Sequence, residues 1–144
     1  MEGEMRNLKF VILAVAVAAM VAGCCPCRKL KIRQAAKEMV GIEWKMIQYG
    51  GKSFENREGY TITFGAENTF TGAGDCNRMK GKYVVNDDGT LKVELPLSTR
   101  MMCSDQEMEN EFFKMIQAVE SWQMDGKLLM LFNHGELVAV FNRQ

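Results

Sequence analysis

The chain has 144 residues, 47% of them hydrophobic, and its 18 basic and 18 acidic side chains give a formal net charge of zero. Because a neutral protein has no general electrostatic attraction to a polyphosphate backbone, nucleic-acid binding is not expected. The sequence contains one histidine and no metalloprotease, P-loop or dinucleotide-binding motif, so nothing in it predicts an enzyme of those classes.

The first 23 residues are organised like a bacterial signal peptide. Arg6 and Lys9 precede an unbroken apolar run at 10–22, which is shorter than the roughly 20 residues that a membrane-spanning helix needs. The run ends in Val-Ala-Gly-Cys24, which resembles the lipobox of bacterial lipoproteins. We therefore expect cleavage before Cys24 and a lipid anchor on its thiol, which places the protein in the cell envelope, on the periplasmic face of the outer membrane. An uncleaved anchor with a chance cysteine is the alternative.

Residues 24–40 are strongly basic, and we interpret them as a tether between the lipid and a folded domain at 41–144. Only Glu38 opposes the positive charges. Basic side chains beside a lipid anchor contribute about 1 kcal/mol each on an anionic membrane surface. A solvated spacer that stays away from the domain is the other interpretation. The basic residues of the tether are Arg28, Lys29, Lys31, Arg33 and Lys37.

Two of the remaining cysteines lie inside the expected domain. Export would place Cys76 and Cys103 where disulfides persist, so we expect them to be bonded to each other. Closing this loop contributes about 3.5 kcal/mol in the chain-entropy model. Cys25 and Cys27 flank Pro26 in the tether and offer only two soft ligands. We therefore predict no metal site and no cofactor, and assign these two cysteines to mixed disulfides or free thiols.

From residue 41 onward, short apolar and aromatic runs alternate with turns rich in Gly, Asn and Asp, which is typical of a β-rich domain. Tyr60–Phe64 alternates with the period of two expected of a half-buried strand. Asp125-Gly126 marks a hairpin. The predicted strands are Glu43–Gln48, Tyr60–Phe64, Thr69–Ala73, Lys82–Val85, Leu91–Leu95, Thr99–Met102, Trp122–Met124, Leu128–Phe132 and Leu137–Phe141.

One amphipathic helix is expected at 105–120, as the only long helix after the signal peptide. Ser104 and Glu107 fit a capping box. Glu109 belongs to a group of acids near the helix start, which we attribute to the helix dipole and a solvated face rather than to a cation site. We also place Glu109 and Lys114 away from the apolar stripe. That stripe consists of Met108, Phe112, Met115, Ile116 and Val119.

This order of elements predicts an α+β fold. Several strands come first, then the helix, then a meander of strands at the C-terminus. The simplest arrangement is a strongly curved antiparallel sheet or partial β-barrel with one α-helix packed on it.

Two segments resemble the META domain, or HslJ-like, family. In the first, at 71–83, Cys76-Asn77 is followed by a glycine and a tyrosine, similar to the family's G-C-N-x-x-x-G-x-Y run. The second, at 99–103, is similar to its T-x-M-x-C run. The resemblance extends over 41–143, essentially the whole expected domain. Asp75 departs from the pattern, because it stands where the family usually has glycine.

The resemblance implies a β-rich fold, an envelope location and a link to heat shock, other stress or antibiotic tolerance, but no catalytic mechanism. It also directs attention to the polar motif residues Asn77, Arg78, Thr99 and Arg100 as possible binding groups. The structural alternative is that these residues satisfy turns and strand ends.

We therefore expect a noncatalytic, monomeric envelope lipoprotein that binds a protein partner or an apolar ligand. A pilot protein that escorts an assembly component to the membrane is the alternative. An envelope hydrolase is least favoured, because a serine or cysteine nucleophile would depend on His134, the single histidine, which lies in a predicted turn.

Lipidation is the most direct consequence of the sequence. A fatty-acid probe should label the wild-type chain and should not label Cys24→Ala, because the thiol that receives the lipid is absent from that variant. Equal labelling of the two chains, measured in cells, would show that Cys24 is not the anchor.

Overall fold

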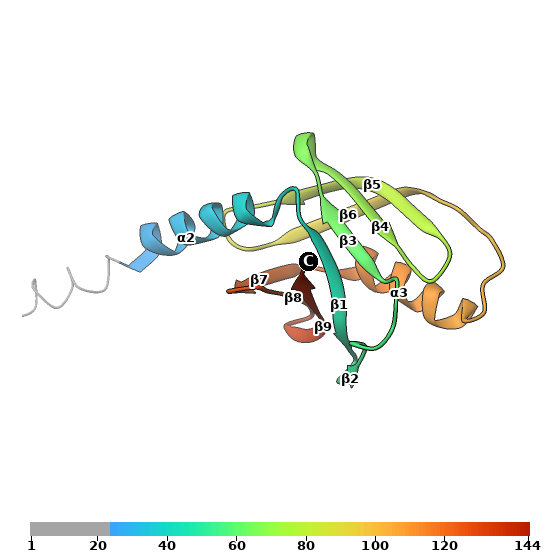
Figure 1. The fold of residues 1–144 in the computed structure, drawn as a ribbon. Helices are drawn as coiled ribbons and strands as arrows, with labels where there is room; N and C mark the ends of the chain where they lie inside the picture. The colour runs from blue at the N-terminus through green and yellow to red at the C-terminus, as the bar shows by residue number, and fades with distance from the viewer. Residues whose placement is uncertain (1–23) are drawn as a thin grey trace, which may run out of the picture.

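The computed structural model describes residues 24–144, and the predicted signal peptide at 1–23 lies outside the described residues. The described chain folds into one nine-stranded sheet with two α-helices (Figure 1). The elements in chain order are α2 Cys24–Met39, β1 Glu43–Tyr49, β2 Lys52–Ser53, β3 Thr61–Phe64, the short 3-10 turn η1 Ala66–Asn68, β4 Thr69–Ala73, β5 Arg78–Val85, β6 Leu91–Ser98, α3 Gln106–Ala118, β7 Ser121–Asp125, β8 Leu128–Asn133 and β9 Glu136–Arg143.

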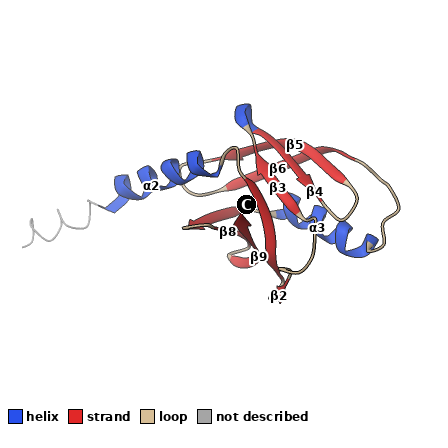
Figure 2. Cartoon of the chain, viewed as in Figure 1, coloured by secondary structure: helices blue, strands red, loops and turns tan. Residues whose placement is uncertain are grey.

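The sheet is antiparallel and curves into a nearly closed barrel. Its strand order is β6-β5-β4-β3-β1-β9-β8-β7, with the short β2 beside β1. The two edge strands meet only at one end, where Thr90 pairs with Ser121 and the N–H of Leu91 donates to the carbonyl of Glu120 at 2.9 Å. Helix α3 packs against β6 (Figure 2). The predicted α+β fold with a strongly curved sheet and a packed helix is confirmed.

Alternation along the strands builds the core. On β5, for example, Met79 and Tyr83 are buried while Arg78, Lys80 and Lys82 are exposed. The inward rows of every strand except β2 and one face of α3 form a single apolar cluster. Its largest fully buried side chains include Trp44, Ile62, Phe64, Phe70, Phe112, Ile116, Leu129 and Phe141.

Helix α3 carries the predicted apolar stripe into this core, and both Phe112 and Ile116 are at most 1% exposed. The prediction that Ser104 is the N-cap of this helix is wrong. Asp105 is the N-cap, and its carboxylate accepts a hydrogen bond from the N–H of Met108 at 3.2 Å. Ser104 instead donates to Asp75 at 2.9 Å, which ties the start of the helix to the β4–β5 turn.

Residues 24–39 are helical, so the expectation of a single long helix is wrong. Their Ala, Leu, Lys, Arg and Gln side chains favour the helical state, and the last turns pack on the barrel. Met39 is fully buried, and the indole N–H of Trp44 donates to its carbonyl at 3.1 Å. Arg33 forms an ion pair with Asp87. The packed domain therefore begins within α2, whose N-terminal half extends away from the barrel (Figure 1). Neither described helix is long and apolar enough to cross a membrane.

The packing of α3 can be tested with a matched pair of variants. Phe112→Ala should lower the free energy of unfolding by about 3–5 kcal/mol, because it leaves a cavity under the helix. Lys114→Ala, two residues along and exposed, should be nearly neutral. Denaturant melts of both proteins make the comparison. A wild-type melt for Phe112→Ala would contradict the packing.

Candidate functional site

The two motif segments, far apart in the sequence, meet at one place. The β4–β5 turn at 74–77 lies against the loop at 99–103, which connects β6 to α3. A disulfide joins Cys76 to Cys103, with the two Cα atoms 5.9 Å apart, within the range that an unstrained bridge requires. The disulfide expected from the cysteine count is therefore present.

Asn77 holds the 99–103 loop with its side chain. It is 2% exposed. Its Oδ1 accepts from the N–H of Met101 at 2.7 Å and from the hydroxyl of Thr99 at 2.9 Å, while its Nδ2 donates to the carbonyl of Met101 at 2.9 Å. The Thr99 hydroxyl in turn accepts from the N–H of Arg78 at 2.9 Å.

These bonds explain why the predicted strand at Thr99–Met102 does not form. An asparagine side chain presents both a donor group and an acceptor, as a peptide unit does. Asn77 thus takes the place of a partner strand for Met101, so the backbone of the loop is hydrogen-bonded without strand pairing. Asn77 and Thr99 serve the structural role that the sequence left open, since they satisfy a turn and a strand end.

Glu109 lies beneath the same turn and is 1% exposed. Its Oε1 accepts from the backbone N–H groups of Cys76 at 3.0 Å and Asn77 at 2.7 Å. Its Oε2 accepts from the side-chain amide of Asn77 and lies 2.9 Å from the sulfur of Cys103. The expectation that Glu109 faces solvent is wrong. A usable signal was present, because residue 109 precedes Phe112 by three positions and Ile116 by seven and so shares their face of the helix.

The environment keeps Glu109 ionised. Burial by itself raises its pKa, but hydrogen bonds from the Asn77 side chain and from the N–H groups of Asn77, Cys76 and Asp75 outweigh burial and lower the pKa below its ordinary value. The carboxylate also explains Gly74, because a Cβ there would lie 2.5 Å from Oε1 of Glu109. Asp75, which departs from the family pattern, has no positive φ and is accommodated without strain.

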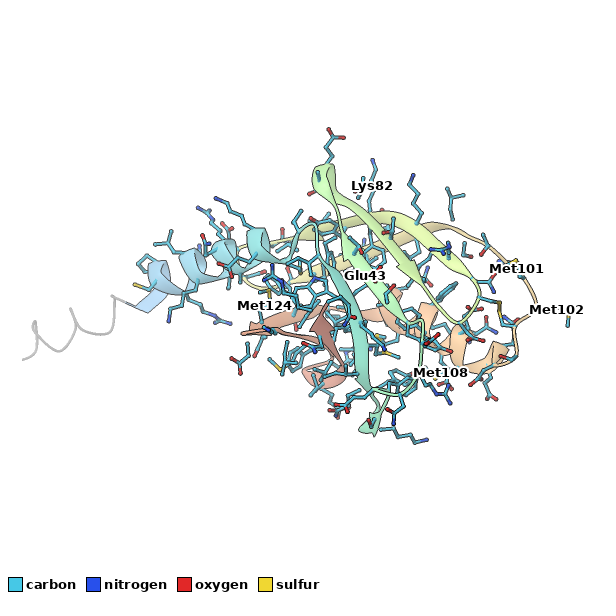
Figure 3. All side chains as sticks on the ribbon, in the orientation of Figure 1. Glu43, Lys82, Met101, Met102, Met108 and Met124 are labelled. Carbon is cyan, nitrogen blue, oxygen red and sulfur yellow. A yellow bond between two sulfur atoms is a disulfide. The ribbon has the colours of Figure 1, made fainter. Side chains whose placement is uncertain are left out.

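A groove of about 630 Å³ opens beside this network, between the 99–103 loop and α3. Asn77 and Glu109 form its base. Met101 and Met102 stand on the loop with 57% and 99% of their surface exposed (Figure 3). The remaining lining residues are Leu95, Ser98, Thr99, Arg100, Gln106, Asn110, Phe113, Lys114 and Gln117.

The other sequence-predicted residues lie outside this buried network. The side chains of Arg78 and Arg100 are exposed, and only Arg100 lines the groove. His134 lies in the β8–β9 turn, with Nδ1 3.5 Å from a carboxylate oxygen of Glu120. The side chain of Cys24 is outside the part of the structure that is described.

Cys76, Cys103 and Glu109 bring three potential metal-ligating atoms within 4.8 Å of one another. Cysteine binds metal as the thiolate, but the two sulfurs form a disulfide here and so neither is a thiolate. While the disulfide is intact, the cluster has only the Glu109 carboxylate to offer.

Comparisons with known proteins agree with the fold. The META domain family model matches residues 37–144. No curated protein matches the sequence. A crystal structure of a DUF4847 family protein from Bacteroides vulgatus has a TM-score of 0.60 at 20% identity, covering 75% of this chain and 96% of that one. An NMR structure of a protein from Burkholderia xenovorans has a TM-score of 0.59 at 20% identity, covering 77% and 87%. At these identities the two structures show similarity of fold alone.

The buried carboxylate makes a prediction about pH. Folding lowers the pKa of Glu109 from its ordinary value of 4.5, so the unfolded state binds the proton more readily. The stabilisation is complete above the ordinary pKa and is lost as the pH falls through the lower, folded-state pKa. Near pH 7, Glu109→Gln should lose about 1–3 kcal/mol of unfolding free energy, because the amide cannot accept all the N–H groups.

Unfolding measured from about pH 7 down to ~3 tests this, since the gap between wild type and Glu109→Gln should close in acid. Glu107→Gln, an exposed neighbour in the first turn of α3, is the control and should change little. A constant gap at every pH would show that the charge of Glu109 is not what stabilises the fold.

Proposed function

This chain belongs to the META domain family, and we propose that it is a noncatalytic, lipid-anchored envelope protein whose domain binds a protein partner or an apolar ligand in the groove beside α3. The exposed pair Met101 and Met102 on a fixed loop is the observation that carries this proposal.

Single exposed apolar side chains are common on protein surfaces, whereas adjacent ones that line a groove are typical of a binding site. Here the loop is not free to turn its methionines inward, because the disulfide and Asn77 hold it from both sides. Leu95 on β6 and Phe113 on α3 add apolar surface to the groove. Methionine adapts its shape readily, which suits a surface that contacts apolar groups of varied outline.

The N-terminal segment supports the membrane part of the proposal. A lipid on Cys24 would place α2 at the membrane, where its basic side chains gain from anionic headgroups. Residues 26–31 are exposed on this helix and Leu30 is 64% exposed, while Ile32 and the residues after it begin to contact the barrel. Helix α2 would thus act as a short spacer that holds the groove away from the bilayer. The expected location is the periplasmic face of the outer membrane.

We further propose that occupancy of the groove helps to maintain the envelope under stress or antibiotic exposure, as the family resemblance implies. If the occupant is a protein that is being delivered to the membrane, the chain would act as a pilot protein. Both versions use the same groove and differ only in the occupant.

Photo-crosslinking in intact cells tests the groove. A photoreactive residue in place of Met102 should crosslink to the occupant, whereas the same residue in place of Leu137, an exposed leucine on β9, should not. A crosslink to protein identifies a partner, and a crosslink to a small apolar molecule identifies a ligand. Equal products from both positions, or none from Met102, would contradict binding in this groove. Repeating the Met102 crosslink in a chain that also carries Cys24→Ala shows whether binding of the occupant requires the lipid anchor.

A further inference from the structure

A second hollow lies on the outward face of the sheet. Its position follows from the strand register, which aligns outward side chains in two rows across β1, β3, β4 and β5. The first row continues onto β6. The first row is Glu43, Thr63, Thr71, Lys80 and Leu97, and the second is Lys45, Thr61, Ala73 and Arg78.

The hollow exists because the middle of these rows contains only short side chains. β3 and β4 present threonine and alanine outward, while β1 and β5 present longer side chains on either side, such as Glu43 and Lys80. The result is a trough of about 600 Å³ and three strand spacings, or roughly 14 Å, across from β1 to β5. Glu43 marks its β1 side (Figure 3).

The polar groups of the trough are left without partners inside the protein. Among the described residues, Thr99 is the only lining threonine whose hydroxyl is hydrogen-bonded, so those of Thr61, Thr63 and Thr71 are free. The four ion pairs of the described chain use the cations Arg33, Arg57, Lys92 and His134. Arg78 and Lys80 therefore stand over the trough uncompensated by a neighbouring carboxylate, and Glu43 is the only acid in the lining.

We propose that this trough binds a short acidic glycan, a chain of sugar rings that carry carboxylate groups. Each threonine hydroxyl both donates and accepts, as a sugar hydroxyl does, while the threonine methyls offer the apolar faces that ring C–H groups contact. The guanidinium of Arg78 matches a carboxylate in bidentate geometry, and Lys80 adds a second positive charge two residues along the same strand. The hydroxyl floor and the cationic side together select a polyhydroxylated acid.

The same features disfavour other occupants. An apolar chain would cover the methyl and methylene surface of the lining, but it would leave three hydroxyls and two cations without hydrogen-bond partners. An extended peptide usually binds by adding a strand to a free sheet edge, but β3 and β4, which form the floor of the trough, are each paired on both sides, and only β6 at its rim has a free edge. Single-stranded nucleic acid needs aromatic side chains on which to stack, and the lining contains none. The trough lies across Thr99 from the methionine groove, and its assignment does not depend on the function proposed for that groove.

The test uses the full chain in detergent micelles and two sugars of equal length, the acidic trigalacturonate and the neutral maltotriose. Trigalacturonate should shift the backbone amide NMR signals of residues 61–63 and 71–73. Higher salt should weaken its binding, because salt screens the charges. The double variant Arg78→Gln with Lys80→Gln should bind about tenfold or more weakly. Lys82→Gln should bind like wild type, because Lys82 faces outward on the same strand but lies outside the trough.

The proposal would be overturned by the absence of shifts with trigalacturonate, by shifts confined to residues outside the trough, or by equal affinity for wild type and the double variant. Equal shifts from the neutral maltotriose would show that the carboxylates are not recognised and would overturn the acidic part of the proposal. A triglutamate peptide that shifts the same signals as strongly would show that the trough recognises negative charge alone and would overturn the glycan assignment. The spectrum without ligand shows in each case that the variant is folded.

Discussion

The buried carboxylate of Glu109 is the interaction on which the site depends. Burying an ionised side chain is costly unless hydrogen bonds replace the lost water, and here backbone N–H groups of the β4–β5 turn and the amide of Asn77 supply them. One side chain therefore fixes three separate pieces of chain: helix α3, the turn that precedes β5, and through Asn77 the loop that follows β6. Gly74 is required by the same contact, since no Cβ fits beside the carboxylate.

Rigidity in the 99–103 loop follows from this network. The disulfide restrains the end of the loop at Cys103, and Asn77 binds its middle at Met101 on both the N–H and the carbonyl. A loop held in this way can present apolar side chains to solvent, because it cannot collapse onto the barrel. The methionine groove is thus a consequence of buried polar bonds rather than of apolar packing alone.

The two surfaces with open binding capacity have different physical origins. The groove arises where β6 and β7 are paired at one end only and α3 packs against β6. The floor of the trough lies on β3 and β4, which are paired on both sides and whose short side chains lie between longer ones. The first surface places exposed methionines among polar side chains, and the second combines hydroxyls and two cations with apolar methyl and methylene surface. A barrel of this size can therefore offer two chemically distinct faces on either side of Thr99.

The sequence by itself determined the fold class, most of the strands, the apolar stripe of α3 and the disulfide, because these depend on local periodicity, turn chemistry and cysteine count. Tertiary structure decided the rest. Helical spacing placed Glu109 on the same face as Phe112, but burial of its carboxylate depends on N–H donors from a turn that is distant in the sequence. The strand expected at Thr99–Met102 is a loop because Asn77, more than twenty residues earlier, bonds its backbone. The trough was invisible for the same reason: its rows join five strands whose register is set by long-range pairing, which no local pattern encodes.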